Sequence, residues 1–386
     1  MLEFHIHFIG ISFNLTESIV AVAFLLFWLT QIFYSLRYFL PATKLKLEST
    51  NVEVQGVSVI VCARNEELNL RELIPIIMEQ DHPEFQLIIV NDSSWDETAD
   101  ILKALQLEYP SMHVIHIDED KQQMQGKKFA LTLGIKAAVH ENILLTDADC
   151  RPRSSKWLTE MTAGLNEKKE IALGFSGYKK YAGYLNKLIR YDAFFIAVNY
   201  FGLARAGLPY MGVGRNLAYT RSVFFRIGGF RAHYKLASGD DDLFVKQAAT
   251  AKNVILKVSP NSQTVSEPHK SWSKWTFQKK RHFTTAPLYE GKVKRRLVFW
   301  PFSYIALWVS AVSLAILTWN PVVLIALATL LFIRYIIQFI ALYISASKLK
   351  IERDIVWLYP ILEKHLIFVQ IMLYVHNLVR KPQKWN

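Results

Sequence analysis

Two short acidic stretches carry side chains that could act on a phosphorylated substrate. In the first, Asp147 and Asp149 directly follow the apolar run 142–145, which is typical of a buried strand. Strand side chains have a period of two, so both carboxylates share one face at the C-terminal end of the strand, where open α/β sheets bind ligands. Two such oxygen donors suit Mg²⁺ or Mn²⁺ that also holds phosphates, although a turn or a helix cap would explain the same pair.

The second stretch places three carboxylates, Asp240 to Asp242, side by side. Three adjacent carboxylates cannot all ionise cheaply in one site, so repulsion raises the pKa of at least one of them. A carboxylate with a raised pKa is a suitable general base for deprotonating a hydroxyl group. The alternative is an exposed acidic turn that caps a helix beginning at Leu243.

Further polar residues lie where a nucleotide could bind. Asp92 follows an apolar run, and its carboxylate could accept hydrogen bonds from a nucleobase imide or from ribose hydroxyls, or could simply cap a helix. Ser94 begins a Ser-x-x-Glu pattern, which we interpret as a capping box. Gly126 precedes a predicted helix, so backbone amides there can approach a phosphate, and Lys127 adds a positive charge.

These residues need a sheet to bring them together, and strand-like and helical patterns alternate between residues 57 and 146. Such alternation predicts an α/β fold with a doubly wound, mostly parallel sheet. No element is evident over 175–215, which we expect to be a long loop. The predicted strands are 57–62, 85–90, 112–117 and 143–146, and the predicted helices are 67–79, one after Ser94, and 128–139.

Apolar segments at both ends predict membrane-spanning helices. Of the 386 residues, 52% are hydrophobic, and the mean hydropathy is +0.15. The run 18–36 is uncharged and long enough to span a bilayer. The uncharged run 297–333 is too long for one span and is broken at Asn320-Pro321, which predicts a hairpin of 297–319 and 321–345. Arg334 lies in the return helix and should face another helix or lipid headgroups rather than acyl chains.

The segment 354–379 is apolar but interrupted by charges, and a fourth span there would place Arg380 on the outer side. We therefore expect an interfacial or re-entrant segment, giving two or three C-terminal membrane helices. The net charge of +12 does not indicate nucleic acid, because much of the basic excess borders apolar runs, as at Arg37, Lys44 and Lys46. These positions predict a cytosolic central domain. The presence of only two cysteines is consistent with a reducing compartment.

From Val57 to about Tyr289, the chain resembles the inverting glycosyltransferases of family 2, which have the GT-A fold. Asn91 stands where the family's nucleotide motif begins with Asp, and His282 stands where its Gln-x-x-Arg-Trp motif ends with Trp. The matching motifs are, in order, the opening strand with Asn65-Glu66, Asn91-Asp92-Ser93-Ser94, Asp147-Ala148-Asp149, the segments 214–219 and 228–230, Gly239-Asp240-Asp241, and Gln278-Lys279-Lys280-Arg281-His282.

The resemblance implies a role for each motif. Asp149 would hold Mg²⁺ or Mn²⁺, and Asp147 would assist it or contact the ribose. Asp241 would be the catalytic base, with Asp240 as the second candidate. The other donor-binding residues would be Ala63 through its backbone, Arg64, Glu66, Asp92 and Lys127. The residues on the acceptor or diphosphate side would be Gln278, Arg281, His282 and Trp275.

The segment near 270–290 has a second interpretation, an amphipathic helix on the membrane surface with aromatic residues in the interface and lysines at the headgroups. His282 in place of Trp weakens the inference of a processive synthase. Trp272 and Trp275 either stack on the acceptor or anchor the helix in the interface.

We therefore expect a metal-dependent enzyme in the inner or plasma membrane that transfers a sugar from a UDP-sugar to a lipid-linked or glycan acceptor. The expected organisation is a membrane anchor over 1–45, a cytosolic catalytic domain over 51–290, and a membrane hairpin with a further segment over 297–386. One alternative is a processive polysaccharide synthase of the same family, which needs a partner membrane subunit. Others are a non-catalytic scaffold and a nucleotidyltransferase, although the latter usually has a Gly/Arg/Lys-rich loop after the first strand, which Ala63-Arg64-Asn65-Glu66 lacks.

Overall fold

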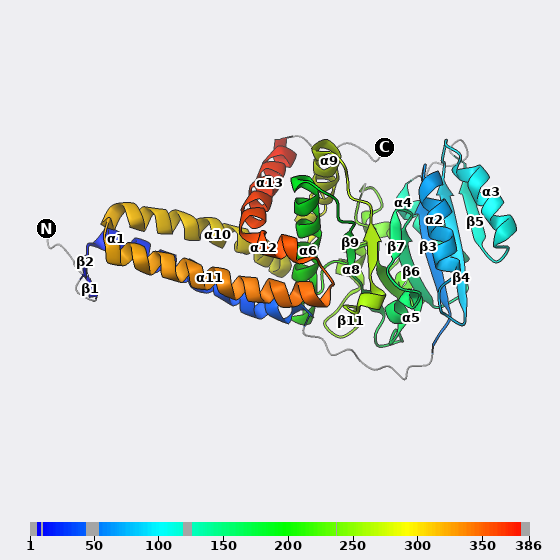
Figure 1. The fold of residues 1–386 in the computed structure, drawn as a ribbon. Helices are drawn as coiled ribbons and strands as arrows, with labels where there is room; N and C mark the ends of the chain where they lie inside the picture. The colour runs from blue at the N-terminus through cyan, green and yellow to red at the C-terminus, as the bar shows by residue number, and fades with distance from the viewer. Residues whose placement is uncertain (1–5, 9–10, 44–53, 119–125, 237, 380–386) are drawn as a thin grey trace.

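The computed structural model describes residues 6–8, 11–43, 54–118, 126–236 and 238–379. The basic residues Lys44, Lys46 and Arg380, which bear on the predicted membrane orientation, lie outside these ranges. The predicted domain bounds at residues 1, 45, 51 and 386 lie outside them too. The described chain forms a sheet-containing half and a bundle of long helices that projects from it (Figure 1).

A seven-stranded sheet in the order β11-β8-β10-β6-β3-β4-β5 forms the centre of the first half. It is mostly parallel, because β3 pairs in parallel with both β4 and β6, while β10 is antiparallel to β6 and β8. The predicted α/β fold is therefore confirmed. The strands are β3 Val57–Ala63, β4 Phe85–Asp92, β5 His113–Ile117, β6 Asn142–Asp147, β8 Ile171–Leu173, β10 Leu217–Thr220 and β11 Val254–Leu256.

Helices cover both faces of this sheet. Alternate residues of β3 point to opposite faces, so that Val57, Val59 and Val61 pack under α2 (Glu67–Met78), α3 (Thr98–Glu108) and α5 (Trp157–Thr162). Ile60 packs on the other face, against α4 (Lys127–Ala137). A small second sheet in the order β7-β12-β9 stands beside the first; its strands are β7 Cys150–Pro152, β9 Ser176–Tyr178 and β12 Thr264–Ser266.

The prediction of a long loop over 175–215 is wrong, because α6 (Tyr184–Arg205) occupies most of it. This helix stands between the sheet and the membrane helices (Figure 1). The amphipathic pattern of α6 is difficult to recognise in the sequence because two charged residues, Arg190 and Asp192, are buried. Arg190 pairs with Glu352 and with Asp354, at 2.5 and 3.0 Å. Burial of these charges is compatible with folding because each has an opposite charge in contact.

Within the described part of the chain, three helices are long and apolar enough to cross a membrane, over Leu15–Ala42, Gly291–Thr318 and Pro321–Lys348. The first contains α1 (Leu15–Tyr34), a π-helical turn η1 (Ser35–Phe39) and the start of a 3₁₀ turn η2 (Leu40–Thr43). The other two are α10 (Gly291–Thr318) and α11 (Pro321–Lys348), so the predicted hairpin broken at Asn320-Pro321 is confirmed. The three helices lie side by side in Figure 1.

The remaining C-terminal helices are α12 (Arg353–Trp357) and α13 (Tyr359–Val379), and α13 rises at an angle to the α10–α11 hairpin (Figure 1). Arg334 on α11 is buried and forms an ion pair with Glu363 on α13 at 3.0 Å. Its second amino group donates to Gln31 on α1 at 2.8 Å. Arg334 thus faces other helices, as predicted, and links α11, α13 and α1.

Candidate active site

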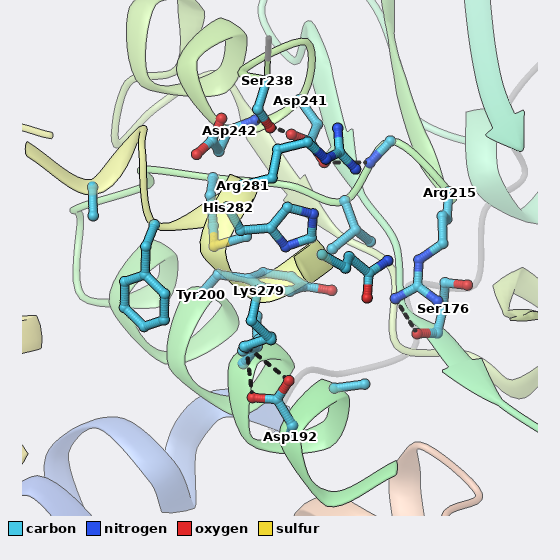
Figure 2. Close-up of a pocket in the computed structure, with 18 of the residues that line it drawn as sticks. Ser176, Asp192, Tyr200, Arg215, Ser238, Asp241, Asp242, Lys279, Arg281 and His282 are labelled. Carbon is cyan, nitrogen blue, oxygen red and sulfur yellow. Dashed lines mark hydrogen bonds and ion pairs between the residues drawn. The ribbon is translucent and has the colours of Figure 1, made fainter. Parts of the chain in front are cut away.

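A cavity of 1760 Å³ runs along the C-terminal edge of the central strands and continues toward α10 and α13. All thirteen residues that the sequence proposes for the site line it, although they come from six separate stretches of the chain. Figure 2 shows part of the cavity, with Arg281 and His282 between the turn of Asp241 above and the Lys279–Asp192 pair below. The lining residues in question are Ala63, Arg64, Glu66, Asp92, Lys127, Asp147, Asp149, Asp240, Asp241, Trp275, Gln278, Arg281 and His282.

The loops after β3 and β4 are tied to each other at one end of the cavity. Asn65 has a left-handed backbone with φ of 57°, and its side-chain oxygen accepts a hydrogen bond from the Trp95 amide at 3.0 Å. Ser94 Oγ accepts from the Asn65 amide at 2.9 Å. The capping-box interpretation of Ser94 is therefore wrong: α3 begins only at Thr98, and Ser94 instead joins the two loops. The sequence analysis did not single out Asn65 for this role.

Lys127 bridges two of the predicted motifs. Its Nζ lies 2.7 Å from Asp147 Oδ1 and 3.3 Å from Asp240 Oδ2. Burial acts to lower the pKa of Lys127, but the two carboxylates outweigh it and hold the pKa well above its ordinary value. The ammonium group is therefore charged at neutral pH. It draws the Asp147 loop and the Asp240 turn together at the centre of the cavity.

Asp147 ends β6, and Asp149 follows in a turn, where both carboxylates line the cavity. Burial, together with the charge of Asp147, raises the pKa of Asp149, which indicates a place where a positive charge would be favourable. Mg²⁺ is commonly held by one or two carboxylates with substrate phosphates and water completing the shell. The two aspartates fit this arrangement, and within the described residues no group of three or more His, Cys, Asp or Glu side chains forms a metal site.

The three carboxylates of the acidic turn have different partners. Asp240 pairs with Lys127, while Asp242 Oδ2 accepts from Tyr289 at 2.7 Å and from Thr285. Asp241 Oδ2 accepts from the Gly214 amide at 2.9 Å, and its Oδ1 accepts from the Asp242 amide at 2.7 Å. Burial and the two flanking carboxylates raise the pKa of Asp241 to about 7. Asp241 does cap α8 (Asp242–Ala248), but the turn lines a cavity and is not an exposed acidic turn.

Lys128 holds the acidic turn in place, and the sequence analysis did not identify it. Its buried Nζ donates to the carbonyl oxygens of His233, Leu236 and Ser238 at 2.6, 3.0 and 2.7 Å. These three bonds fix the backbone that leads into Asp240. The pattern Lys127-Lys128 offers only a weak signal for this role, because adjacent side chains on a helix point in different directions.

The predicted membrane-surface helix is α9 (Trp272–His282), and it faces inward more than expected. Lys279 is buried and pairs with Asp192 on α6 at 2.8 Å, so the expectation that the lysines lie at lipid headgroups is wrong for this residue. Trp275 is also buried and packs edge-on against Trp272, whose ring centroid is 5.8 Å away. Gln278, Arg281 and His282 line the cavity instead of a membrane surface.

Arg215 is a further charged group at the cavity. Its guanidinium lies over the Tyr178 ring, 4.4 Å from the centroid, and donates to Ser266 Oγ at 3.1 Å. The small sheet supplies both partners, because Tyr178 ends β9 and Ser266 ends β12. Figure 2 shows Arg215 beside Ser176, across the cavity from the acidic turn. Arg215 lies in the segment 214–219, one of the motifs that carry the family resemblance, but that motif indicated no role for Arg215 itself.

Comparison with known proteins identifies the fold. Residues 58–234 match the model of Glycosyl transferase family 2. This segment is a family 2 glycosyltransferase domain. The structure of the mannosyltransferase PcManGT from Pyrobaculum calidifontis, in complex with GDP-Man and Mn²⁺, superimposes with a TM-score of 0.57 and 18% identity, over 87% of this chain and 99% of that one. The domain therefore has the GT-A fold.

Two curated relatives align with a shorter part of the chain. The poly-beta-1,6-N-acetyl-D-glucosamine synthase of Staphylococcus epidermidis is 30% identical over 105 residues, 27% of this chain and 24% of that protein. The 4,4'-diaponeurosporenoate glycosyltransferase of Staphylococcus aureus (strain USA300) is 31% identical over 106 residues, 28% of this chain and 27% of that protein. The chain thus matches about a quarter of the length of each relative.

Proposed function

We propose that the protein transfers a sugar from a nucleotide diphosphate sugar, most simply a UDP-sugar, to a hydroxyl group of a lipid-linked or glycan acceptor, with inversion at the anomeric carbon. The observation that carries the proposal is the shared cavity. It joins a candidate nucleotide end at Asp92, a candidate metal pair at Asp147 and Asp149, and a buried carboxylate, Asp241, with a raised pKa. The family match of residues 58–234 supports the same chemistry.

In this proposal Asp241 accepts the proton of the acceptor hydroxyl. The hydroxyl oxygen then attacks the anomeric carbon from the face opposite the diphosphate, and the bond from that carbon to the phosphate oxygen breaks. A divalent cation at Asp147 and Asp149 would stabilise the charge of the leaving diphosphate. Arg281 lies beside the acidic turn and supplies positive charge on the same side of the cavity (Figure 2).

We assign the nucleotide to the end of the cavity formed by Ala63, Arg64, Glu66 and Asp92. The Asn65–Trp95 bond closes this end, and Trp95 exposes its indole beside it. Lys127 would bind near the diphosphate, because it is charged and lies between Asp147 and Asp240. Gln278, His282 and Trp275 would contact the acceptor on the opposite side.

We also propose a membrane topology. Residues 1–45 anchor the chain, 51–290 form the catalytic domain on the cytoplasmic side of an inner or plasma membrane, and 297–386 form the hairpin with the further segment. Support comes from the three long apolar helices and from Lys292, Lys294, Arg295 and Arg296 at the start of α10. In this topology the segment 354–379 forms α12 and α13, and one side of these helices packs against α6.

The test is nucleotide release from a panel of UDP- and GDP-sugars, with detergent-solubilised protein and Mg²⁺ or Mn²⁺. We expect release from one donor, and loss of release with a chelator and in Asp241→Asn. Folded protein that binds no nucleotide would contradict the proposal and favour a non-catalytic scaffold. Products that grow by many sugar units would instead favour the polysaccharide synthase alternative.

A further inference from the structure

The cavity has an apolar arm that the donor does not need. Beyond Arg281 it continues between α10 and α13, where apolar side chains line it: Leu297, Val298, Phe302, Ile305, Ile367 and Ile371. Val298 and Phe302 remain 61% and 54% exposed, and Ile371 remains 42% exposed. α10 is one of the helices long and apolar enough to cross a membrane. An apolar chain in the bilayer can therefore reach the acidic turn along this arm without crossing water.

The charged side chains of the arm are already engaged. Lys279 and Asp192 neutralise each other in a buried pair. Lys294 donates to the Pro287 carbonyl oxygen at 2.8 Å. Gln370 and Tyr374 add two polar groups on the α13 side, but the rest of the arm is apolar with compensated charges. Such a surface suits a hydrocarbon chain better than a glycan, because glycan hydroxyls need hydrogen-bond partners when they are buried.

The acidic turn favours one kind of acceptor head group, a hydroxyl rather than a phosphate. Asp240, Asp241 and Asp242 lie together where the arm joins the donor end. They would repel an acceptor phosphate, because the cations beside the turn are already compensated: Lys127 is shared by Asp147 and Asp240, and the charge of Arg281 acts on Asp240, whose pKa it lowers. A phosphate acceptor is also ionised without help, whereas a hydroxyl group needs a base such as Asp241 to become a nucleophile.

We infer that the acceptor is an uncharged lipid alcohol, with its hydrocarbon chain in the arm between α10 and α13 and its hydroxyl group at Asp241. The inference rests on the proposed function and narrows its acceptor to one chemical class. The proton passes from the lipid hydroxyl to Asp241, the lipid oxygen bonds to the anomeric carbon, and the nucleoside diphosphate leaves. The product is a neutral glycolipid that stays in the membrane.

Two matched lipids test the head group. The full chain is reconstituted in phosphatidylcholine vesicles with the donor found in the panel, and with either hexadecanol or hexadecyl phosphate. We expect at least tenfold more labelled sugar in the organic extract with hexadecanol. Equal or greater transfer to hexadecyl phosphate would overturn the inference. So would transfer to a soluble oligosaccharide such as chitotriose with none to hexadecanol.

Photolabelling tests the arm without relying on turnover. A hexadecanol that carries a diazirine near its chain end should label peptides of α10 and α13. Ile371→Trp should lower this labelling about fivefold because it fills the arm. Met372→Trp is the matched control, because Met372 is the next residue of α13 and is also exposed, 55% against 42% for Ile371, but does not line the cavity. Absent labelling, or equal loss in both variants, would overturn the inference. Specific labelling without nucleotide release from any donor would instead refute the proposed function and the acceptor role together, and leave only a lipid-binding site.

Discussion

The amide of Gly214 donates a hydrogen bond to Asp241 Oδ2 at 2.9 Å, which fixes the carboxylate that we propose as the base. Gly214 lies in the turn before β10, while Asp241 caps α8, so the contact joins two parts of the chain that are 27 residues apart. Side chains engage Asp240 and Asp242, whereas the hydrogen bonds that Asp241 accepts from the described residues come from backbone amides. Backbone amides therefore orient both carboxylate oxygens of Asp241, and the carboxylate keeps lone pairs that can accept a proton.

The raised pKa of Asp241 predicts a pH dependence. Only the ionised carboxylate can act as base, so kcat/KM should rise with pH and level off above about 7, falling about tenfold per pH unit below that value. The effect on stability has the opposite sign. The folded-state pKa lies above the unfolded value, so the contribution of this group to stability is present at low pH and is lost as pH rises through about 7.

The measurement is kcat/KM from pH 5.5 to 8.5 for the wild-type protein. Asp241→Asn should lose turnover while it still binds nucleotide. Asp100→Asn, an exposed carboxylate on α3, serves as the matched control and should behave as wild type. A flat profile, or full activity in Asp241→Asn, would refute the role of Asp241.

Removing the carboxylate of Asp149 should separate metal binding from folding. We expect Asp149→Ala to lose the part of nucleotide affinity that depends on Mn²⁺, because two carboxylates become one. Stability should not fall, since burial and repulsion already disfavour the charged Asp149. Titration calorimetry of UDP with and without Mn²⁺ measures the effect. Unchanged metal dependence in Asp149→Ala would remove this residue from the site.

Lys128 should control the acidic turn without contacting substrate. Lys128→Met leaves the carbonyl groups of His233, Leu236 and Ser238 without their shared donor. We expect a loss of stability of about 2 kcal/mol, since each unsatisfied buried acceptor costs free energy. We also expect a lower kcat with little change in donor KM. Lys136→Met, at an exposed position of the same helix, is the matched control, and equal behaviour of the two variants would exclude the role.

Arg334 and Glu363 should each destabilise the long apolar helices when the other is removed. Glu363→Gln leaves a buried guanidinium without its counter-charge, which costs about 3 kcal/mol or more. The double variant Arg334→Met, Glu363→Leu should recover most of that loss, because no unpaired charge remains. Thermal unfolding in detergent compares the three proteins. A double variant no more stable than Glu363→Gln would show that the pair itself carries the stability.

Much of the catalytic half could be predicted from the sequence, because its strands are continuous apolar runs that end in polar clusters. β3, β4 and β6 fall within two residues of their predicted bounds, and the carboxylates at their ends meet in the cavity. The helix α6 could not be predicted, since Arg190 and Asp192 occupy buried positions and their partners lie far along the chain. Lys128 was missed for the same reason: its three partners are carbonyl oxygens 105 to 110 residues away.

The closeness of α6 to the end of α1 has a consequence for how the protein is made. A side chain at Gly202 would meet the backbone oxygen of Tyr38 at 2.3 Å, so the two segments pack backbone to backbone. Phe195 on α6 packs with Phe39 and with Trp300, which lies in the first half of α10. The ribosome releases Trp300 after the whole catalytic half has emerged. We therefore expect that half to keep part of its apolar interior open until α10 has formed and packed against α6.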